Sequence, residues 1–141
     1  MRLLILDNDL GFLFWLANGL GPHGYYIVPA DSVAHANRLI RRLKLTIDLL
    51  IVNPEVEGAA ELIASLRREN PRLQVVALVP EGTPQSELSG IEANAMRAKP
   101  DLSAVVDPEH SPVSEEKQAE WLRFVKQILG RTNTAGGSRA N

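Results

Sequence analysis

The chain has 141 residues, enough for one domain with a buried core, and its lack of cysteine excludes disulfide scaffolds, thiolate metal sites and cysteine nucleophiles. Fifteen Lys and Arg against 17 Asp and Glu give a formal net charge of -2, so no basic excess favours nucleic acid or an anionic membrane as a partner. No apolar run approaches the roughly 20 residues that span a bilayer, and we expect a cytoplasmic protein.

The first half of the chain alternates between apolar runs and helical patterns. The first run, residues 3–6, is continuously apolar and ends at Asp7, which is typical of a strand buried on both faces of a parallel sheet. The elements that follow are expected to be a helix at about 11–20, a strand at 25–28, a helix at 33–43 after an Asp31-Ser32 cap, and a strand at 48–52.

The second half continues the alternation with weaker signals. The expected elements are a helix marked by residues 60–66 that ends before Pro71, a strand at 73–79, a short or irregular helix at 83–94, a strand at 95–98, a loop at 101–113 and a last helix from Ser114 to Gly130. We expect residues 1–130 to form one domain and residues 131–141 a flexible tail.

Five strands alternating with five helices predict an α/β fold with a parallel five-stranded sheet. Ligands of such folds bind at the carboxyl ends of the strands, near the point where the strand order reverses. The residues that follow the predicted strands, or end them, are therefore the candidate site: Asp7, Asn8, Asp9, Asn53, Val79 and Lys99.

These strand ends resemble the receiver domain of bacterial two-component response regulators. The resemblance runs from Met1 to about residue 129 and rests on four pieces, Leu6-Asp7-Asn8-Asp9, Asp48-Leu49-Leu50-Ile51-Val52, Asn70-Pro71 and Lys99-Pro100. It implies a single-domain, doubly wound (βα)5 fold of the flavodoxin-like, CheY-like type.

The resemblance also implies a role for each strand-end position. In this family, two acids after the first strand and an Asp after the third hold Mg²⁺, and that Asp accepts a phosphoryl group from a partner histidine. A Thr or Ser after the fourth strand and a Lys after the fifth bind the phosphoryl oxygens. Here Asp7 matches the first acid, Asn8 replaces the second with Asp9 beside it, Asn53 stands at the acceptor position, Val79 at the Thr/Ser position, and Lys99 matches the lysine.

The departures from the pattern remove the chemistry that the pattern serves. Phosphoryl transfer needs an ionised carboxylate as nucleophile, and the amide of Asn53 is a poor substitute. Val79 has no hydroxyl, and Asp7 and Asp9 alone would hold Mg²⁺ weakly or not at all. We therefore expect a pseudo-receiver that is not an enzyme, needs no cofactor, and acts by contacting a histidine kinase, a phosphotransfer protein or an output protein.

Other interpretations of the same residues stay open. The chain is an active response regulator if another acid, Asp9 or Glu55, accepts the phosphoryl group. It is an unrelated small enzyme on the same fold if Asp7, Asp9, Glu55 or Lys99 supplies a nucleophile or base. In structural terms, Asp7 and Asp9 cap the first helix, and Lys99 pairs with Asp7 or is solvated.

Large apolar residues on the first and last helices are candidates for protein interfaces. Five of them stand in a row at residues 12–16, where Phe12, Leu16 and Leu20 form a core line and Phe14, with Leu13, is expected to face outward. On the last helix, Leu122, Val125 and Leu129 form the expected core line. The remaining interface candidates lie beside these core lines: Trp15, Trp121, Phe124 and Ile128. They would contact a partner protein, or a second copy of the chain through the last helix. Alternatively, they are buried.

Overall fold

The computed structural model describes residues 1–79, 95–98 and 112–137. In chain order its elements are β1 (Arg2–Leu6), α1 (Leu10–Leu20), the 3-10 helix η1 (Gly21–His23), β2 (Tyr26–Ala30), α2 (Val33–Leu43), β3 (Leu49–Val52), α3 (Ala59–Glu69), β4 (Gln74–Val79), β5 (Ala95–Ala98) and α4 (Pro112–Gly137). Each predicted strand or helix within these residues is present, and apart from the last helix, which is longer than predicted, the ends move by up to a few residues. The helix predicted at 83–94 lies outside the described part of the chain.

The strands form one parallel sheet in the order β2-β1-β3-β4-β5. Leu6, the last residue of β1, pairs with Ala30 of β2 and with Val52 of β3, so three strands end at the same level. The strand order reverses at β1, which has β2 on one side and β3 on the other. The carboxyl ends of β1 and β3 therefore lie where a doubly wound fold places its ligand site.

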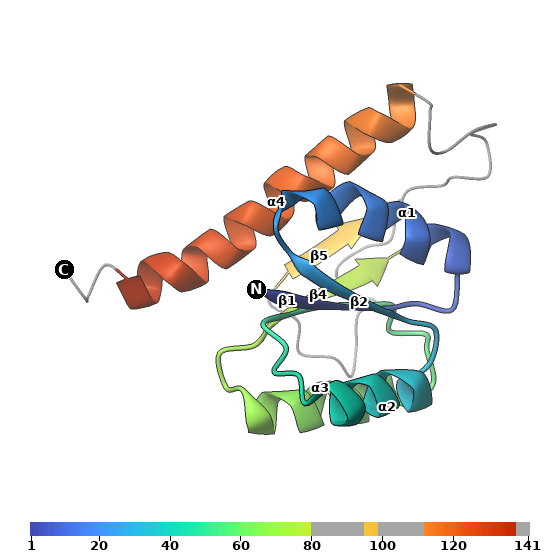
Figure 1. Ribbon diagram of the computed structural model, residues 1–141, viewed down its shortest axis with the longest axis vertical. Helices are drawn as coiled ribbons and strands as arrows, with labels where there is room; N and C mark the ends of the chain where they lie inside the picture. Colours follow the sequence, from blue (N-terminus) through green and yellow to red (C-terminus); the bar gives the residue numbers. More distant parts are fainter. Residues whose placement is uncertain (80–94, 99–111, 138–141) are drawn as a thin grey trace.

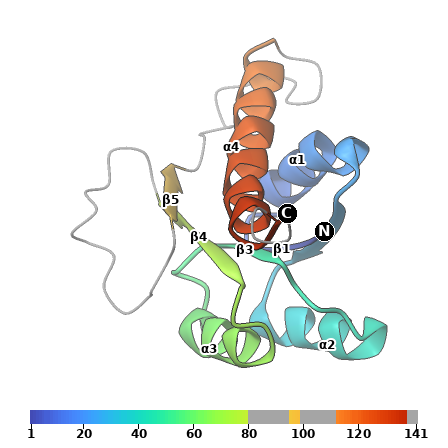
Figure 2. The same ribbon diagram turned by 90° about the vertical axis from the view of Figure 1, so that its left-hand side faces the viewer.

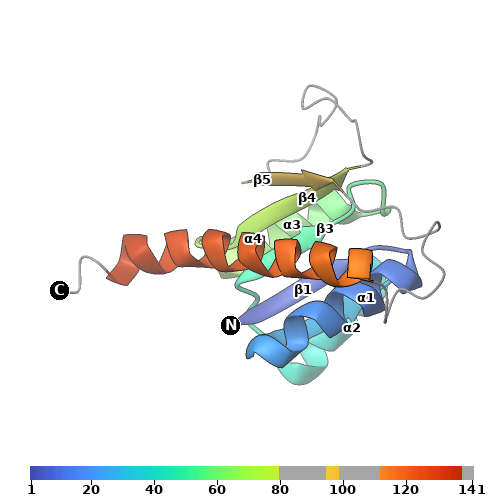
Figure 3. The ribbon, with the colours of Figure 1, turned by 90° about the horizontal axis from the view of Figure 1, so that it is seen from above.

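Helices cover both faces of the sheet. Figures 1 and 2 show α1 and α4 over one face and α2 and α3 side by side over the other. Seen from above in Figure 3, α4 runs across its face of the sheet beside α1. This three-layer arrangement confirms the predicted doubly wound, flavodoxin-like fold.

The core has two parts because successive residues of a strand point to opposite faces of the sheet. Leu3 and Ile5 of β1 pack toward α1 and α4, whereas Leu4 and Leu6 pack in the cluster with α2 and α3. All four side chains have no exposed surface. The continuous apolar run at residues 3–6 thus marks a strand buried on both faces, as predicted.

Helix α1 is buried more completely than its sequence suggested. Phe12 is buried and Phe14 is 58% exposed, as predicted, but Leu13 and Trp15 are only 2% and 4% exposed. The outward placement of Leu13 and the surface role of Trp15 were therefore wrong. The cause is α4, which covers a second side of α1 and whose Gln118 Nε2 donates a hydrogen bond to the Trp15 carbonyl at 2.8 Å.

Helix α4 presents a different stripe to the core from the predicted one. Trp121 and Ile128 are 2% and 3% exposed and pack in the core with Val125 and Leu129, while Phe124 is only partly buried. Residues 121, 125, 128 and 129 follow helical spacing, so they share one face. The prediction that Trp121 and Ile128 lie beside the core was wrong, and both are unavailable to a partner in the folded chain.

Helix α4 is also longer than predicted. It begins at Pro112 and continues to Gly137, so the predicted cap at Ser114 and stop at Gly130 were wrong. Proline is favoured in the first turn of a helix, and one interior glycine costs a helix only about 1 kcal/mol. The division into a domain to residue 130 and a flexible tail stays a prediction. Across the described residues, no helix combines the length and apolarity that a membrane crossing requires.

Candidate functional site

The side chains that follow β1 and β3 meet at the carboxyl edge of the sheet. The backbone N–H of Asn53 donates to the Leu6 carbonyl at 2.8 Å, and that of Asp7 donates to the Ala30 carbonyl at 3.2 Å. These bonds continue the ladders one residue past the strands and place Asp7 and Asn53 side by side. Asp7 is fully buried, the one charged residue in the core of the described chain.

The buried carboxylate of Asp7 is held by N–H groups. Its Oδ1 accepts a hydrogen bond from the backbone N–H of Asp9 at 3.0 Å and another from Nδ2 of Asn53 at 3.3 Å. Hydrogen bonds to the ionised form are what make a buried carboxylate tolerable. The amide of Asn53 therefore contributes a neutral donor at the point where a carboxylate would contribute a second negative charge.

The loop after β3 fixes the other end of that amide. Asn53 Oδ1 accepts the backbone N–H of Glu55 at 3.0 Å, which closes an Asx turn, and the Asn53 carbonyl accepts the N–H of Val56 at 3.1 Å. Val56 is buried, and Gly58, at φ +84°, then provides the left-handed residue before α3. Both ends of the Asn53 amide are engaged, so its nitrogen faces Asp7 and its oxygen faces the turn.

The remaining acids of the predicted site lie at the surface. Asp9 is exposed and caps α1, with its Oδ1 accepting the backbone N–H of Phe12 at 3.2 Å. Asn8 and Glu55 are exposed. The structural interpretation of Asp9 as a helix cap is thus confirmed, whereas Asp7 contributes to the buried pair instead.

Replacing Asp9 with alanine tests the cap. We expect Asp9→Ala to lower the free energy of unfolding by about 1 kcal/mol, because the N–H of Phe12 loses its acceptor. Asp9→Asn keeps a capping oxygen and serves as the matched control, with an expected change of a few tenths of a kcal/mol. Urea unfolding curves measure both; equal losses in the two variants would show that the charge of Asp9, and not its cap, matters.

The last two predicted positions, Val79 and Lys99, stand at the ends of the predicted fourth and fifth strands. Val79 is the final residue of β4, is 7% exposed and pairs with Ala98 of β5. Its apolar side chain is part of the buried strand and offers no hydroxyl to a phosphoryl group. Lys99 lies outside the described residues, and its pairing with Asp7 stays a prediction.

The residues at this edge do not fit Mg²⁺. The ion prefers several anionic oxygens in octahedral geometry. Oδ1 of Asp7 accepts two N–H donors, and the buried Oδ2 accepts no hydrogen bond from a described residue, so Asp7 offers one carboxylate oxygen at most. Asp9 caps a helix and Asn53 is neutral, so the several anionic oxygens are not supplied. Over the described residues, no group of three or more His, Asp or Glu side chains is placed to hold a metal ion.

Sequence reasoning missed a cation held between two aromatic rings. The guanidinium carbon of Arg97 on β5 lies 4.7 Å from the ring centroid of Phe124 and 5.3 Å from that of Trp121. Burial lowers the pKa of Arg97, Glu120 at 3.9 Å raises it, and Arg123 lowers it. Arg97 ties β5 to α4, and no spacing in the sequence links residues 97 and 121. Phe124 remains the partly exposed interface candidate on this helix.

Sequence comparisons connect the chain to bacterial regulators. No protein-family model matches it. Over 82 residues, or 58% of the chain, it is 28% identical to the transcriptional regulatory protein GlrR of Escherichia coli K12, and equally to the transcriptional regulatory protein QseF of Escherichia coli O157:H7. The chain spans only 18% of the length of these relatives.

Structural comparisons agree with the sequence matches. A protein from Chloroflexus aurantiacus J-10-fl, assigned as a response regulator, is 26% identical with a TM-score of 0.64, over 92% of this chain and 97% of that one. A response regulator from Thermotoga maritima is 21% identical with a TM-score of 0.67, over 92% and 97% of the two chains. NtrX from Brucella abortus is 16% identical with a TM-score of 0.73, over 99% of this chain and 28% of that one. Together with the strand order, these similarities show that the chain has the fold of response-regulator receiver domains, with the buried Asp7 at the carboxyl edge of the sheet.

Proposed function

We propose that this receiver domain signals without being phosphorylated and acts as a protein-interaction module. The single observation that carries the proposal is the hydrogen bond from Asn53 Nδ2 to the buried carboxylate of Asp7, at 3.3 Å. An amide nitrogen donates at the point where phosphoryl transfer would require a carboxylate nucleophile. Because Val79 has no hydroxyl and the acids present do not fit Mg²⁺, the other two contributions to that chemistry are missing as well.

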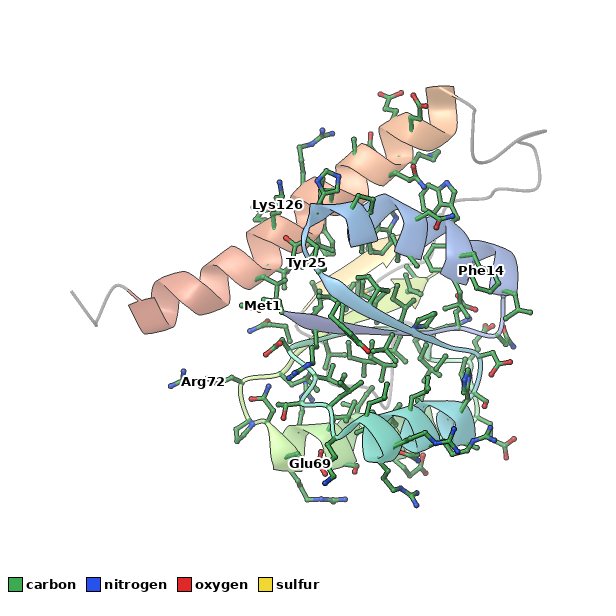
Figure 4. All side chains as sticks on the ribbon, viewed as in Figure 1. Met1, Phe14, Tyr25, Glu69, Arg72 and Lys126 are labelled. Carbon is green, nitrogen blue, oxygen red and sulfur yellow. The ribbon has the colours of Figure 1, made fainter. Side chains whose placement is uncertain are left out.

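The partners belong to the same proposal. Response regulators contact kinases and output domains, and we propose that this chain contacts a histidine kinase, a phosphotransfer protein or an output protein in the cytoplasm. Leu10 and Phe14 of α1 support an exposed contact surface, because they are 52% and 58% exposed and stand one helical turn apart. In Figure 4, Phe14 lies at the end of the molecule opposite Met1 and Arg72. We regard dimerisation through α4 as a weaker alternative, since of its predicted anchors only Phe124 is partly exposed.

The alternative is an active response regulator that uses Asp9 or Glu55 as the acceptor. Both carboxylates are exposed, so a phosphodonor can reach them, and this favours the alternative. Against it stands the role of Asp9, whose Oδ1 is committed to the cap of α1.

An NMR experiment distinguishes the two functions. We expect the ¹H–¹⁵N spectrum of the uniformly labelled chain to be unchanged, beyond the effect of salt, when acetyl phosphate and Mg²⁺ are added together. New peaks for residues after β1 and β3 that disappear in Asp9→Asn or in Glu55→Gln would establish the alternative and name its acceptor.

A further inference from the structure

A shallow groove lies on α2, the helix that carries none of the strand-end residues. It has a volume of about 220 Å³ and is lined by His35, Arg38, Leu39 and Arg42. These positions stand three, four and seven residues apart, so they share one side of the helix. Figure 1 places α2 over the face of the sheet opposite α1. The residues that line the groove include neither Asp7 nor Asn53.

The groove concentrates positive charge on one side of the helix. Arg38 and Arg42 are exposed, and neither forms a salt bridge with another described residue. Helix α2 contains no acidic residue between Val33 and Leu43, so nothing on the helix itself neutralises the two guanidinium groups. Leu39, partly buried against the core, gives the groove an apolar wall.

His35 is oriented by groups at the start of the helix. Its backbone N–H donates to Oγ of the capping residue Ser32 at 3.1 Å, and its Nδ1 lies 3.2 Å from Oδ1 of Asp31. The pairing with Asp31 engages Nδ1, so Nε2 is the ring nitrogen of His35 that is left for a ligand. Asp31 is the acid beside the groove, and its carboxylate is engaged with this imidazole.

We infer that this groove binds a phosphate-class dianion. Arg38 and Arg42 stand one helical turn apart, about 6 Å along the axis, so their planar forks can approach one anion from two sides. A tetrahedral phosphoryl group presents oxygens in both directions and toward the imidazole, which a planar carboxylate does not. Since ligand pockets for whole small molecules occupy about 300–1,000 Å³, this smaller groove suits the phosphoryl group alone.

The phosphoryl group that binds can belong to free phosphate or to a phosphorylated side chain of a partner protein. Titration of the ¹⁵N-labelled full chain with inorganic phosphate, and separately with O-phosphoserine at matched ionic strength, tells these sources apart. We expect saturable shifts in the amide signals of α2. Arg38→Gln and Arg42→Gln should each weaken binding about tenfold, because each removes a charged hydrogen-bonding group.

Arg41→Gln is the matched control, because it removes the same charge from the same helix at an exposed residue that does not line the groove. We expect it to change the dissociation constant less than twofold. The inference is overturned if neither probe gives saturable shifts, or if Arg41→Gln weakens binding as much as the two groove variants do. The latter result would show diffuse attraction to surface charge in place of a site. Both outcomes are independent of whether the chain accepts phosphoryl groups.

Discussion

Changing Asn53 to Asp should destabilise the chain in the absence of divalent cations and make it responsive to Mg²⁺. In the wild type, Nδ2 of Asn53 donates to the fully buried carboxylate of Asp7. The substitution removes this donor and sets a second carboxylate against the first. We expect the free energy of unfolding at neutral pH in EDTA to fall by about 2–3 kcal/mol.

Two further measurements on the Asn53→Asp variant follow from the same contact. Mg²⁺ should restore much of the lost stability, because an ion that binds only the folded pair stabilises it by mass action, whereas the melting temperature of the wild type should not respond. Acidification should also reduce the deficit. Protonation of one of two adjacent carboxylates removes their mutual repulsion, so the stability lost to the second charge should return progressively as the pH falls.

Asn8→Asp is the matched control, since it makes the same charge change at an exposed neighbour. We expect it to alter stability in EDTA by no more than about 0.5 kcal/mol. Equal stability of Asn53→Asp and wild type in EDTA would mean that the bond from Asn53 to Asp7 contributes nothing.

Truncating Trp121 should lower the free energy of unfolding more than Asn53→Asp does. Its ring is 2% exposed, lies 6.2 Å from that of Phe12 and 5.8 Å from that of Phe124, and has the guanidinium of Arg97 at 5.3 Å. Trp121→Ala would leave a cavity between α1, α4 and the sheet. We expect the free energy of unfolding to fall by about 3–5 kcal/mol in urea unfolding.

Phe14→Ala is the comparison, because it removes an aromatic ring that is 58% exposed. Its expected effect on stability is within about 0.5 kcal/mol. If Trp121→Ala leaves too little folded protein to measure, Trp121→Phe should give a smaller loss that is still larger than that of Phe14→Ala. A tolerated Trp121→Ala together with a costly Phe14→Ala would reverse the assignment of core and surface on these helices.

The fold was predictable because its central strands are unambiguous. Residues 3–6 and 49–52 are apolar at every position, as a strand covered on both faces requires, and helical patterns separate them. The orientation of the helices was harder to predict. Residues 12–16 of α1 are all large and apolar, so this stretch contains no polar position to show which of its side chains face out.

Helix α4 shows the same difficulty in another form. Apolar residues at 121, 122, 124, 125, 128 and 129 allow two neighbouring stripes, each with helical spacing. The structure buries the stripe with Trp121, because this ring meets Phe12 of α1. That contact joins residues more than a hundred positions apart and leaves no periodic signal in either helix.

The residues of the candidate site could be predicted from the sequence, but the way in which their side chains are oriented could not. Parallel strands end at one edge, so the proximity of Asp7 and Asn53 follows from their places after β1 and β3. The direction of the Asn53 amide does not follow, because it depends on the turn in which its oxygen accepts the N–H of Glu55. That turn is what directs a hydrogen-bond donor at the buried carboxylate.

The central claim is that this chain does not take up a phosphoryl group, and intact-mass spectrometry tests it most directly. The wild-type protein is incubated with acetyl phosphate and Mg²⁺ at neutral pH and weighed without digestion. We predict a mass equal to that of the untreated chain. A stoichiometric gain of about 80 Da, the mass of one HPO₃ group, that is lost in Asp9→Asn or Glu55→Gln would contradict the account.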